Sequence, residues 1–355
     1  MNLFSEDCIK VGNDLYMIAR ALNIAYTVNV QTGNLKVIDA LHDTSAQTPR
    51  SGACILLHSR SIYFLPMNAR VINAYNLKSG EWKTIEIDHI DGCYGDRFFG
   101  GIVHNDTLHM IGHTYPAIVT LDLKSLKVNI ANTEIYSRMK DEKDKNKIGD
   151  CYIRKDFAIV GEKLYAASCV SNHVLIYDLN SKKAELVNVG KKGMRFSGIA
   201  YDGKNFWLAS RMTMEFYKWD IVTGKIDAFE IDKTSKEDFY LSGVVYDGLN
   251  VIFTGMNSSY SYIINPFADN TMQSLDQIDR SFTFVRNYGD IDYCMTPQGY
   301  IELRSVGDFK TIVKKIDVNI NDSVAINFVN KKGEVFQETQ TVSLSEFING
   351  ITQEI

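Results

Sequence analysis

The sequence lacks the features that mark several special classes of protein. Only five of its 355 residues are proline, and it has no run of about 20 apolar residues that could span a bilayer as a helix. The 38 basic side chains do not outnumber the 43 acidic ones, and the net charge of −5 argues against nucleic-acid and anionic-membrane partners. The segment from Met1 to Asp7 lacks the basic and apolar stretches of a secretory signal, so we expect a cytoplasmic protein.

Close cysteine pairs and local catalytic motifs are also absent. The six cysteines are scattered with no C-x-x-C pair, which fits buried free thiols better than a zinc site or a disulfide framework. The sequence contains no G-x-S-x-G, P-loop or H-E-x-x-H motif. We therefore predict no metal and no cofactor, and the question whether the protein is an enzyme stays open.

What the sequence does contain is a repeat made of short, alternating apolar runs, which is the periodicity of β-strands. In each unit an apolar residue and a mostly aromatic neighbour are followed, 13 residues after the second of them, by Asp or Asn. The six pairs are Leu15-Tyr16, Ile62-Tyr63, Leu108-His109, Leu164-Tyr165, Phe206-Trp207 and Val251-Ile252. The matching turn residues are Asn29, Asn76, Asp122, Asp178, Asp220 and Asn265. Successive units lie 47, 46, 56, 42 and 45 residues apart.

The chemistry of these turn residues predicts the fold. An Asp or Asn side chain can bond the backbone two residues further on and so stabilise the turn that ends a strand. A second turn precedes the apolar pair, as at Asp202-Gly203 and Asp247-Gly248, and Asp-Gly is a strong hairpin signal. Each unit thus predicts a four-stranded meander of about 40–50 residues, which is typical of a propeller blade. We predict an all-β fold in which residues 1–355 form a single β-propeller of seven four-stranded blades, with six or eight as alternatives.

The seventh blade follows the repeat least closely, and two segments lie outside the regular repeat. We expect the strands of this blade at residues 292–295, 300–303, 312–317 and 324–328, followed by a C-terminal closure segment at 330–355. The step of 56 residues predicts a charged insertion between blades at 137–149, either a solvated loop or a lid. Helical patterns occur only at 120–135 and at 343–355, and the pattern of 120–135 fits a strand better than a helix.

Individual blades resemble the repeats of kelch and galactose-oxidase-like propellers. Ile62-Tyr63-Phe64-Leu65 is similar to a kelch strand, and Tyr75 and Trp82 are similar to the kelch tyrosine and tryptophan. The paired glycines of kelch strands are missing at that position, the nearest being Gly112 and Gly255. The resemblance covers most of the chain at the level of the repeat. It implies the fold and no particular activity.

Arginine recurs at the positions that lead into the first strand of a blade. In a propeller meander these connections share one face with the loops between the second and third strands. The first series comprises Arg50, Arg97, Arg154 and Arg195, and the second includes Arg20, Arg70, His113 with Tyr115, Asn172 with His173, Arg211 and Asn257. A ring of guanidinium groups there would focus a positive potential, and their planar forks suit carboxylate, phosphate or sulfate. The predicted ligand-binding residues are Arg50, Arg70, Arg97, Arg154, Arg195 and Arg211.

Three functional hypotheses follow from this pattern. The first is a cytoplasmic binding or scaffold module for an anionic small molecule, such as an acidic sugar or phosphorylated metabolite, or for an acidic peptide or protein. The second is a propeller-type lyase or hydrolase acting on an anionic substrate, in which His113, His173 or Tyr240 transfers protons. The third is a protein-interaction platform whose arginines pair with acidic residues of the same loops, namely Asp96, Asp150, Glu237, Asp238 and Asp279.

Overall fold

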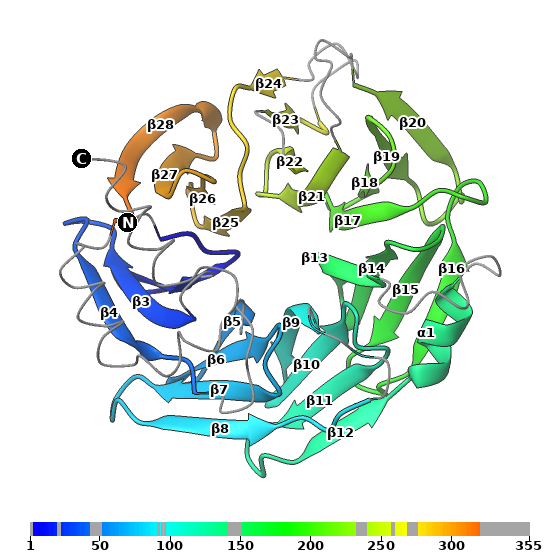
Figure 1. The fold of residues 1–355 in the computed structure, drawn as a ribbon. Coiled ribbons are helices and arrows are strands. Elements are labelled where there is room, and N and C mark those ends of the chain that lie inside the picture. The colour runs from blue at the N-terminus through cyan, green and yellow to red at the C-terminus, as the bar shows by residue number, and fades with distance from the viewer. Residues whose placement is uncertain are drawn as a thin grey trace, which may run out of the picture.

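The chain folds into a closed ring of sheets in the computed structural model, which describes residues 3–19, 23–42, 52–90, 93, 95, 97–140, 151–231, 240–256, 260–267 and 276–319. Within these ranges 28 strands form seven four-stranded antiparallel sheets, placed around a central channel (Figure 1). This confirms the predicted all-β propeller of seven blades. No helix in the described part of the chain is long and apolar enough to cross a membrane.

Every blade is a meander of four strands that follow one another in the chain. The first two blades consist of β1 (Cys8–Val11), β2 (Asp14–Ala19), β3 (Ile24–Asn29), β4 (Leu35–Ala40), β5 (Gly52–His58), β6 (Ser61–Pro66), β7 (Val71–Asn76) and β8 (Trp82–Glu86). The third and fourth consist of β9 (Phe98–His104), β10 (Thr107–Gly112), β11 (Ile118–Asp122), β12 (Val128–Ala131), β13 (Ile153–Val160), β14 (Lys163–Ser168), β15 (His173–Asp178) and β16 (Ala184–Asn188).

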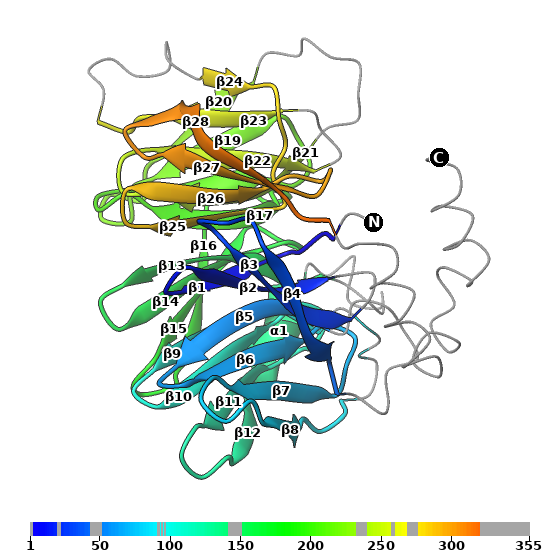
Figure 2. The ribbon, with the colours of Figure 1, turned by 90° about the vertical axis from the view of Figure 1, so that its left-hand side faces the viewer.

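The remaining three blades repeat this plan. They consist of β17 (Phe196–Tyr201), β18 (Phe206–Ser210), β19 (Glu215–Trp219), β20 (Ile226–Glu230), β21 (Tyr240–Tyr246), β22 (Val251–Met256), β23 (Ser261–Ile264), β24 (Asp276–Ile278), β25 (Phe284–Tyr288), β26 (Ile291–Met295), β27 (Tyr300–Ser305) and β28 (Asp308–Asp317). Seen from the side, the strands run between the two ends of the ring (Figure 2). The first strand of each blade lies innermost, so the seven first strands line the channel.

The predicted turn chemistry is present in all six regular units. The Asn76 carboxamide accepts hydrogen bonds from the backbone N–H groups of Lys78 and Ser79, both at 2.9 Å. The Asp220 carboxylate accepts them from Val222 at 2.8 Å and Thr223 at 3.1 Å. Equivalent bonds are made by Asn29, Asp122, Asp178 and Asn265. These side chains fix the turn between the third and fourth strands, which explains the constant spacing of the repeat.

Apolar side chains fill the space between neighbouring blades. Seven clusters of buried residues are found, one at each blade-to-blade junction. Between blades five and six, for example, the Phe216 and Phe253 rings lie 4.5 Å apart and pack with Trp207. Each sheet is therefore covered on both faces, and the ring is stabilised by contacts between neighbours.

The seventh blade corrects the sequence analysis by one strand. The segment at 292–295 belongs to the second strand, β26, and the first strand is β25, which the prediction had not recognised. The turn between them contains Gly289 with a φ of +77°, the same kind of glycine turn that joins β21 to β22. The segments at 300–303 and 312–317 are accordingly the third and fourth strands. Residues 324–328 and 330–355 lie outside the described residues.

One short helix, α1 (Thr133–Met139), was not predicted. It follows β11 and β12, which confirm strand character at 120–122 and 128–131, and it buries Ile135, Tyr136 and Met139 against blade four. The Tyr136 hydroxyl accepts a hydrogen bond of 2.9 Å from the backbone of Gly112. The predicted insertion at 137–149 thus begins in the last turn of a helix, and its part beyond Lys140 lies outside the described residues.

The ring closes by packing of the last blade on the first, without exchange of a strand. The backbone N–H of Leu3 donates to the carbonyl of Val318 at 2.8 Å, and the Tyr288 hydroxyl donates to the carbonyl of Cys8 at 3.1 Å. One apolar cluster contains Tyr26 of blade one together with Tyr293 of blade seven.

Candidate functional site

Backbone hydrogen bonds join the two arginine-bearing loop series at one end of the ring. Arg97 N–H donates to the Met67 carbonyl at 2.6 Å, and His113 N–H donates to the Arg97 carbonyl at 2.7 Å. Tyr152 N–H donates to His113 at 2.6 Å, and Cys169 N–H donates to Tyr152 at 2.7 Å. Loops of blades two, three and four are thereby tied together. We call this end, formed by residues 67–70, 97, 113–117, 151–152, 169–172, 195 and 211–214, the loop end.

The predicted arginines occupy different depths of the loop end. Arg154, Arg195 and Arg211 are half-buried, and Arg70 is exposed. Arg97 is only 4 % exposed and lies near Cys93 and Tyr115; burial raises the pKa of both, and the Arg97 guanidinium opposes that rise. Arg50 lies outside the described residues.

Arg154 and Arg211 are the pair that the structure brings to one place. Arg154 belongs to β13 of blade four, and Arg211 follows β18 of blade five. Both guanidinium groups act on His113 of blade three and on Cys169 of blade four. The backbone N–H of Arg211 also donates to the Arg195 carbonyl at 3.0 Å, which places the Arg195 backbone beside them.

The pKa of the His113 side chain shows the effect of the positive charges of Arg154 and Arg211. Its Nδ1 lies 2.6 Å from the Ile153 carbonyl and donates to it, so the proton of the neutral ring is on Nδ1. Burial lowers the pKa of His113 to about 3, with a further lowering by Arg154 and Arg211 that the Ile153 carbonyl partly offsets. Burial raises the pKa of the Cys169 thiol, and the same two arginines oppose that rise. Two neighbouring groups thus feel the same pair of cations.

The other two catalytic candidates are His173 and Tyr240. His173 Nδ1 lies 2.8 Å from the Ser171 hydroxyl, and the side chain of Tyr240 lies outside the described part of the chain. Of the predicted acidic partners, Asp279 accepts a hydrogen bond of 3.2 Å from Gln277. Asp96, Asp150, Glu237 and Asp238 lie outside the described residues. No group of three His, Cys, Asp or Glu side chains that could hold a metal occurs among the residues described.

The residues that lead into the first strands form β-bulges. In blades two, three, five and six one extra residue interrupts the pairing with the second strand; these residues are Ala53, Phe99, Ser197 and Ser242. The buried hydroxyls of Ser197 and Ser242 donate to strand carbonyls at 3.4 and 3.2 Å, which is a structural role. In blade four the bulge is longer, because residues 154–156 face a single residue of β14.

The long bulge of blade four carries Lys155 and Asp156 into the channel. Asp156 accepts a hydrogen bond of 2.9 Å from the backbone N–H of Val244, and Lys155 Nζ donates to the Thr283 carbonyl. Room for Asp156 comes from a glycine of blade six, since a Cβ atom on Gly243 would come within 2.0 Å of the carboxylate oxygen. Burial raises the pKa of Asp156 and lowers the pKa of Lys155.

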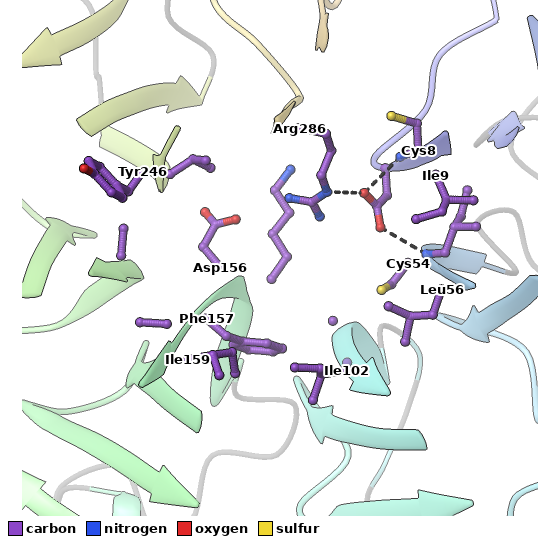
Figure 3. A pocket seen from close by; sticks show the side chains of 18 of the residues that line it. Cys8, Ile9, Cys54, Leu56, Ile102, Asp156, Phe157, Ile159, Tyr246 and Arg286 are labelled. Carbon is purple, nitrogen blue, oxygen red and sulfur yellow. Dashed lines mark hydrogen bonds and ion pairs between the residues drawn. The ribbon is translucent and has the colours of Figure 1, made fainter. Parts of the chain in front are cut away.

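An ion pair lies across the channel from these residues, where the ring closes. Arg286 Nε donates to Asp7 Oδ1 at 2.6 Å. The two Asp7 oxygens also accept backbone hydrogen bonds from Cys8 at 2.9 Å and Ile55 at 3.0 Å. Burial would lower the pKa of Arg286, but the Asp7 carboxylate reverses the shift and raises it. These four charged groups stand at one end of a cavity of about 370 Å³ that the innermost strands of all seven blades line (Figure 3).

The sequence analysis missed this channel site. It gave no role to Asp7, Lys155 or Asp156. The available signal was a charged residue directly after two apolar residues of an innermost strand, as in Phe284–Tyr288. A charge buried in a strand that faces a channel is expensive unless it is paired, so such positions point to function or to specific pairing.

Comparison with known proteins shows the fold alone. No protein-family model and no curated protein matches the sequence. Virginiamycin B lyase from Staphylococcus aureus is similar in structure with a TM-score of 0.62 and 11 % identity, over 83 % of this chain and 94 % of that one. A catalytically inactive histidine-to-alanine form of that enzyme, solved with quinupristin, gives a TM-score of 0.62 and 12 % identity over the same shares.

A structure that is not named as a lyase is also similar. BamB from Moraxella catarrhalis has a TM-score of 0.54 and 13 % identity, covering 80 % of this chain and 79 % of that one. At such identities the similarity extends to the β-propeller fold and not to an activity.

Proposed function

We propose that the protein is a propeller binding module whose loop end takes an anionic ligand between Arg154 and Arg211. The observation that supports this is their common action on His113 and Cys169. Two cations from different blades converge there, next to a histidine that stays neutral. Guanidinium groups in a half-buried place attract an anion more strongly than exposed ones, because less water screens them.

The ligand class follows from the geometry of the guanidinium group. Its planar fork binds carboxylate and phosphate through two parallel hydrogen bonds. We therefore propose an acidic sugar, a phosphorylated metabolite or an acidic peptide segment as the ligand. Arg195 lies beside the pair through its backbone, and Arg97, Arg70 and Arg50 complete the proposed rim. The kelch-like character of the blades and a cytoplasmic location remain predictions from the sequence.

A thermal-shift experiment tests the proposal. Galacturonate, glucose 6-phosphate and a short polyglutamate peptide are added to the wild type and to the Arg154→Gln and Arg211→Gln variants. A ligand at 100 times its dissociation constant stabilises the folded state by about 2.7 kcal/mol. We expect one anion class to stabilise the wild type and to lose that effect in both variants. The matched control is Arg60→Gln, an exposed arginine in the turn between β5 and β6 at the opposite end. Equal shifts in all four proteins would contradict the site.

A lyase or hydrolase that acts at the same place is the second candidate. His113 is neutral at pH 7, the form that a general base requires, and the charges of both arginines act on it. Two of the structural neighbours are named as lyases. The test is to incubate the stabilising anion, and separately quinupristin, with the wild type and with His113→Gln, and to follow products by mass spectrometry. Turnover by the wild type that is lost in His113→Gln supports an enzyme. Binding of the anion without turnover supports a binding module.

A further inference from the structure

The central channel contains a cavity that the loop-end proposal does not use. Its walls are formed by the middle and later residues of the innermost strands, with Ile9, Leu56, Ile102, Phe157 and Ile159 prominent among them (Figure 3). Each innermost strand starts at the loop end and finishes at the turn that leads to the second strand. The cavity therefore lies toward the turn end, on the far side of the Lys155–Asp156 bulge from the arginines.

We call the charged end of the cavity, with Asp7, Lys155, Asp156 and Arg286, the floor, and the opposite end is exposed toward the turns. Along β13, Asp156 is 7 % exposed, whereas Ile159, close to the turn at Gly161, is 40 % exposed. Ile159 is one of few large apolar side chains with so much exposed surface in the described part of the chain, and it lines the cavity. Exposed apolar surface inside a concave site is typical of a place that a ligand covers.

The floor offers one donor and one acceptor from different sides of the ring. Asp156 and Arg286 project toward the middle of the channel in Figure 3. Arg286 uses Nε for Asp7 and keeps 29 % of its side-chain surface open. Asp156 uses Oδ2 for the Val244 N–H. A guanidinium group has five N–H donors and a carboxylate has about four acceptor positions, so each retains capacity for a ligand.

Charge decides which head group fits this floor. Two positive groups, Lys155 and Arg286, stand beside two negative ones, Asp7 and Asp156, and the charges of Arg154 and Glu6, one of each sign, also act on Lys155. An anionic head would meet the carboxylates and a cationic head would meet the cations, whereas a neutral amide both accepts from Arg286 and donates to Asp156. The volume of about 370 Å³ is at the small end of the range for ligand sites.

We propose that this cavity is a second binding site, for a small amphipathic molecule whose neutral head carries a carboxamide and whose apolar part lies against Ile159 and Phe157. Arg286 donates to the amide oxygen, and Asp156 accepts from the amide nitrogen. The cavity lining contains Lys155 and Asp156 of the blade-four bulge but not Arg211, so the site is distinct from the Arg211 side of the loop end, whereas Arg154 acts on Asp156 through its charge.

Three probes with one skeleton test the head-group preference: phenylacetamide, phenylacetate and phenethylamine. Binding is followed by saturation-transfer NMR and titration up to the solubility limit. We expect phenylacetamide to bind the wild type at least tenfold more tightly than the two charged compounds. Failure of phenylacetamide to bind, or equal binding of all three, overturns the proposal.

Matched variants locate the binding. Ile159→Trp fills the cavity from an already exposed position and should abolish amide binding, whereas Val222→Trp, at a 91 % exposed position in the turn between β19 and β20, should not.

A variant of the floor tests the head group. Asp156→Asn keeps the oxygen that accepts from Val244, and it should weaken the binding of phenylacetamide and strengthen the binding of phenylacetate. Arg211→Gln should leave amide binding unchanged, so a failure of the loop-end site is distinguishable from a failure here. Unchanged amide binding in Ile159→Trp would place the compound elsewhere and refute the assignment.

Discussion

The loop end and the channel floor hold their charges in opposite ways. On the floor each charge has a neighbour of opposite sign, Arg286 with Asp7 and Lys155 with Asp156. At the loop end two like charges, Arg154 and Arg211, act together on His113. A balanced set satisfies itself and can recognise a neutral, dipolar group, whereas a set of like charges favours an anion from outside. The two proposed sites thus differ in electrostatic character.

The largest expected effect comes from unbalancing the floor. Asp7→Asn leaves Arg286 next to Lys155 without a neighbouring full negative charge of its own. Removal of one partner from a buried pair costs about 3–5 kcal/mol, so we expect the free energy of unfolding to fall by that amount in urea titrations. The control is Asp227→Asn, which removes an exposed partner of Lys225 and should cost about 0–1 kcal/mol. Similar losses in both variants would show that the floor is not a coupled set.

The second largest expected effect is the pH dependence of stability that comes from the lowered pKa of His113, which burial and the two loop-end arginines cause. Its pKa in the folded state, about 3, lies below the ordinary 6.5, so the unfolded chain takes up the proton first as the pH falls. The contribution of His113 to stability is complete above pH 6.5 and declines by about 1.4 kcal/mol per pH unit below it, until about pH 3. We expect His113→Gln to show a shallower loss of stability than the wild type between pH 6.5 and pH 5 in urea titrations. Parallel curves would mean that His113 is protonated in the folded state.

The smallest expected effect lies in a turn that is remote from both sites. Asn76→Ala removes two hydrogen bonds to the backbone in an exposed turn, and we expect a loss of about 1 kcal/mol, measured by thermal unfolding. Ligand binding at the loop end and in the channel should not change. Lys78→Ala, in the same turn, is the control and should have little effect. A change in anion binding on Asn76→Ala would show that blade two transmits strain to the loop end.

The success of sequence analysis here depended on how local each feature is. The bonds of Asp220 or Asn76 span two or three residues, so their spacing is visible in the chain and predicts the blades. In blade seven no Asp or Asn stands 13 residues after Tyr293, where Val306 lies instead, and the strands were misassigned by one. The Arg286–Asp7 pair joins residues 279 positions apart, and only the closed ring brings them together. No local pattern could have predicted it.

The degree of burial of the loop-end arginines could not be predicted from the sequence either. Arg97 and Arg154 stand at nearly the same offset in their units, yet Arg97 is buried beside Tyr115 and Arg154 is half-buried beside His113. The difference arises from the bulges, since one residue is extra in blade three and residues 154–156 loop out in blade four. A repeat predicts where a residue recurs, and the local backbone decides where its side chain goes.

The closure of the ring without strand exchange has a consequence for how the protein is made. Each blade can pair its four strands as soon as it leaves the ribosome, because they are consecutive in the chain. The face of blade one that packs on blade seven, with Leu15, Met17 and Tyr26, has to wait until Phe284 to Ile316 have been synthesised. For most of translation this apolar face of blade one therefore stays uncovered. Truncations that remove blade seven are expected to aggregate, even though six complete blades remain.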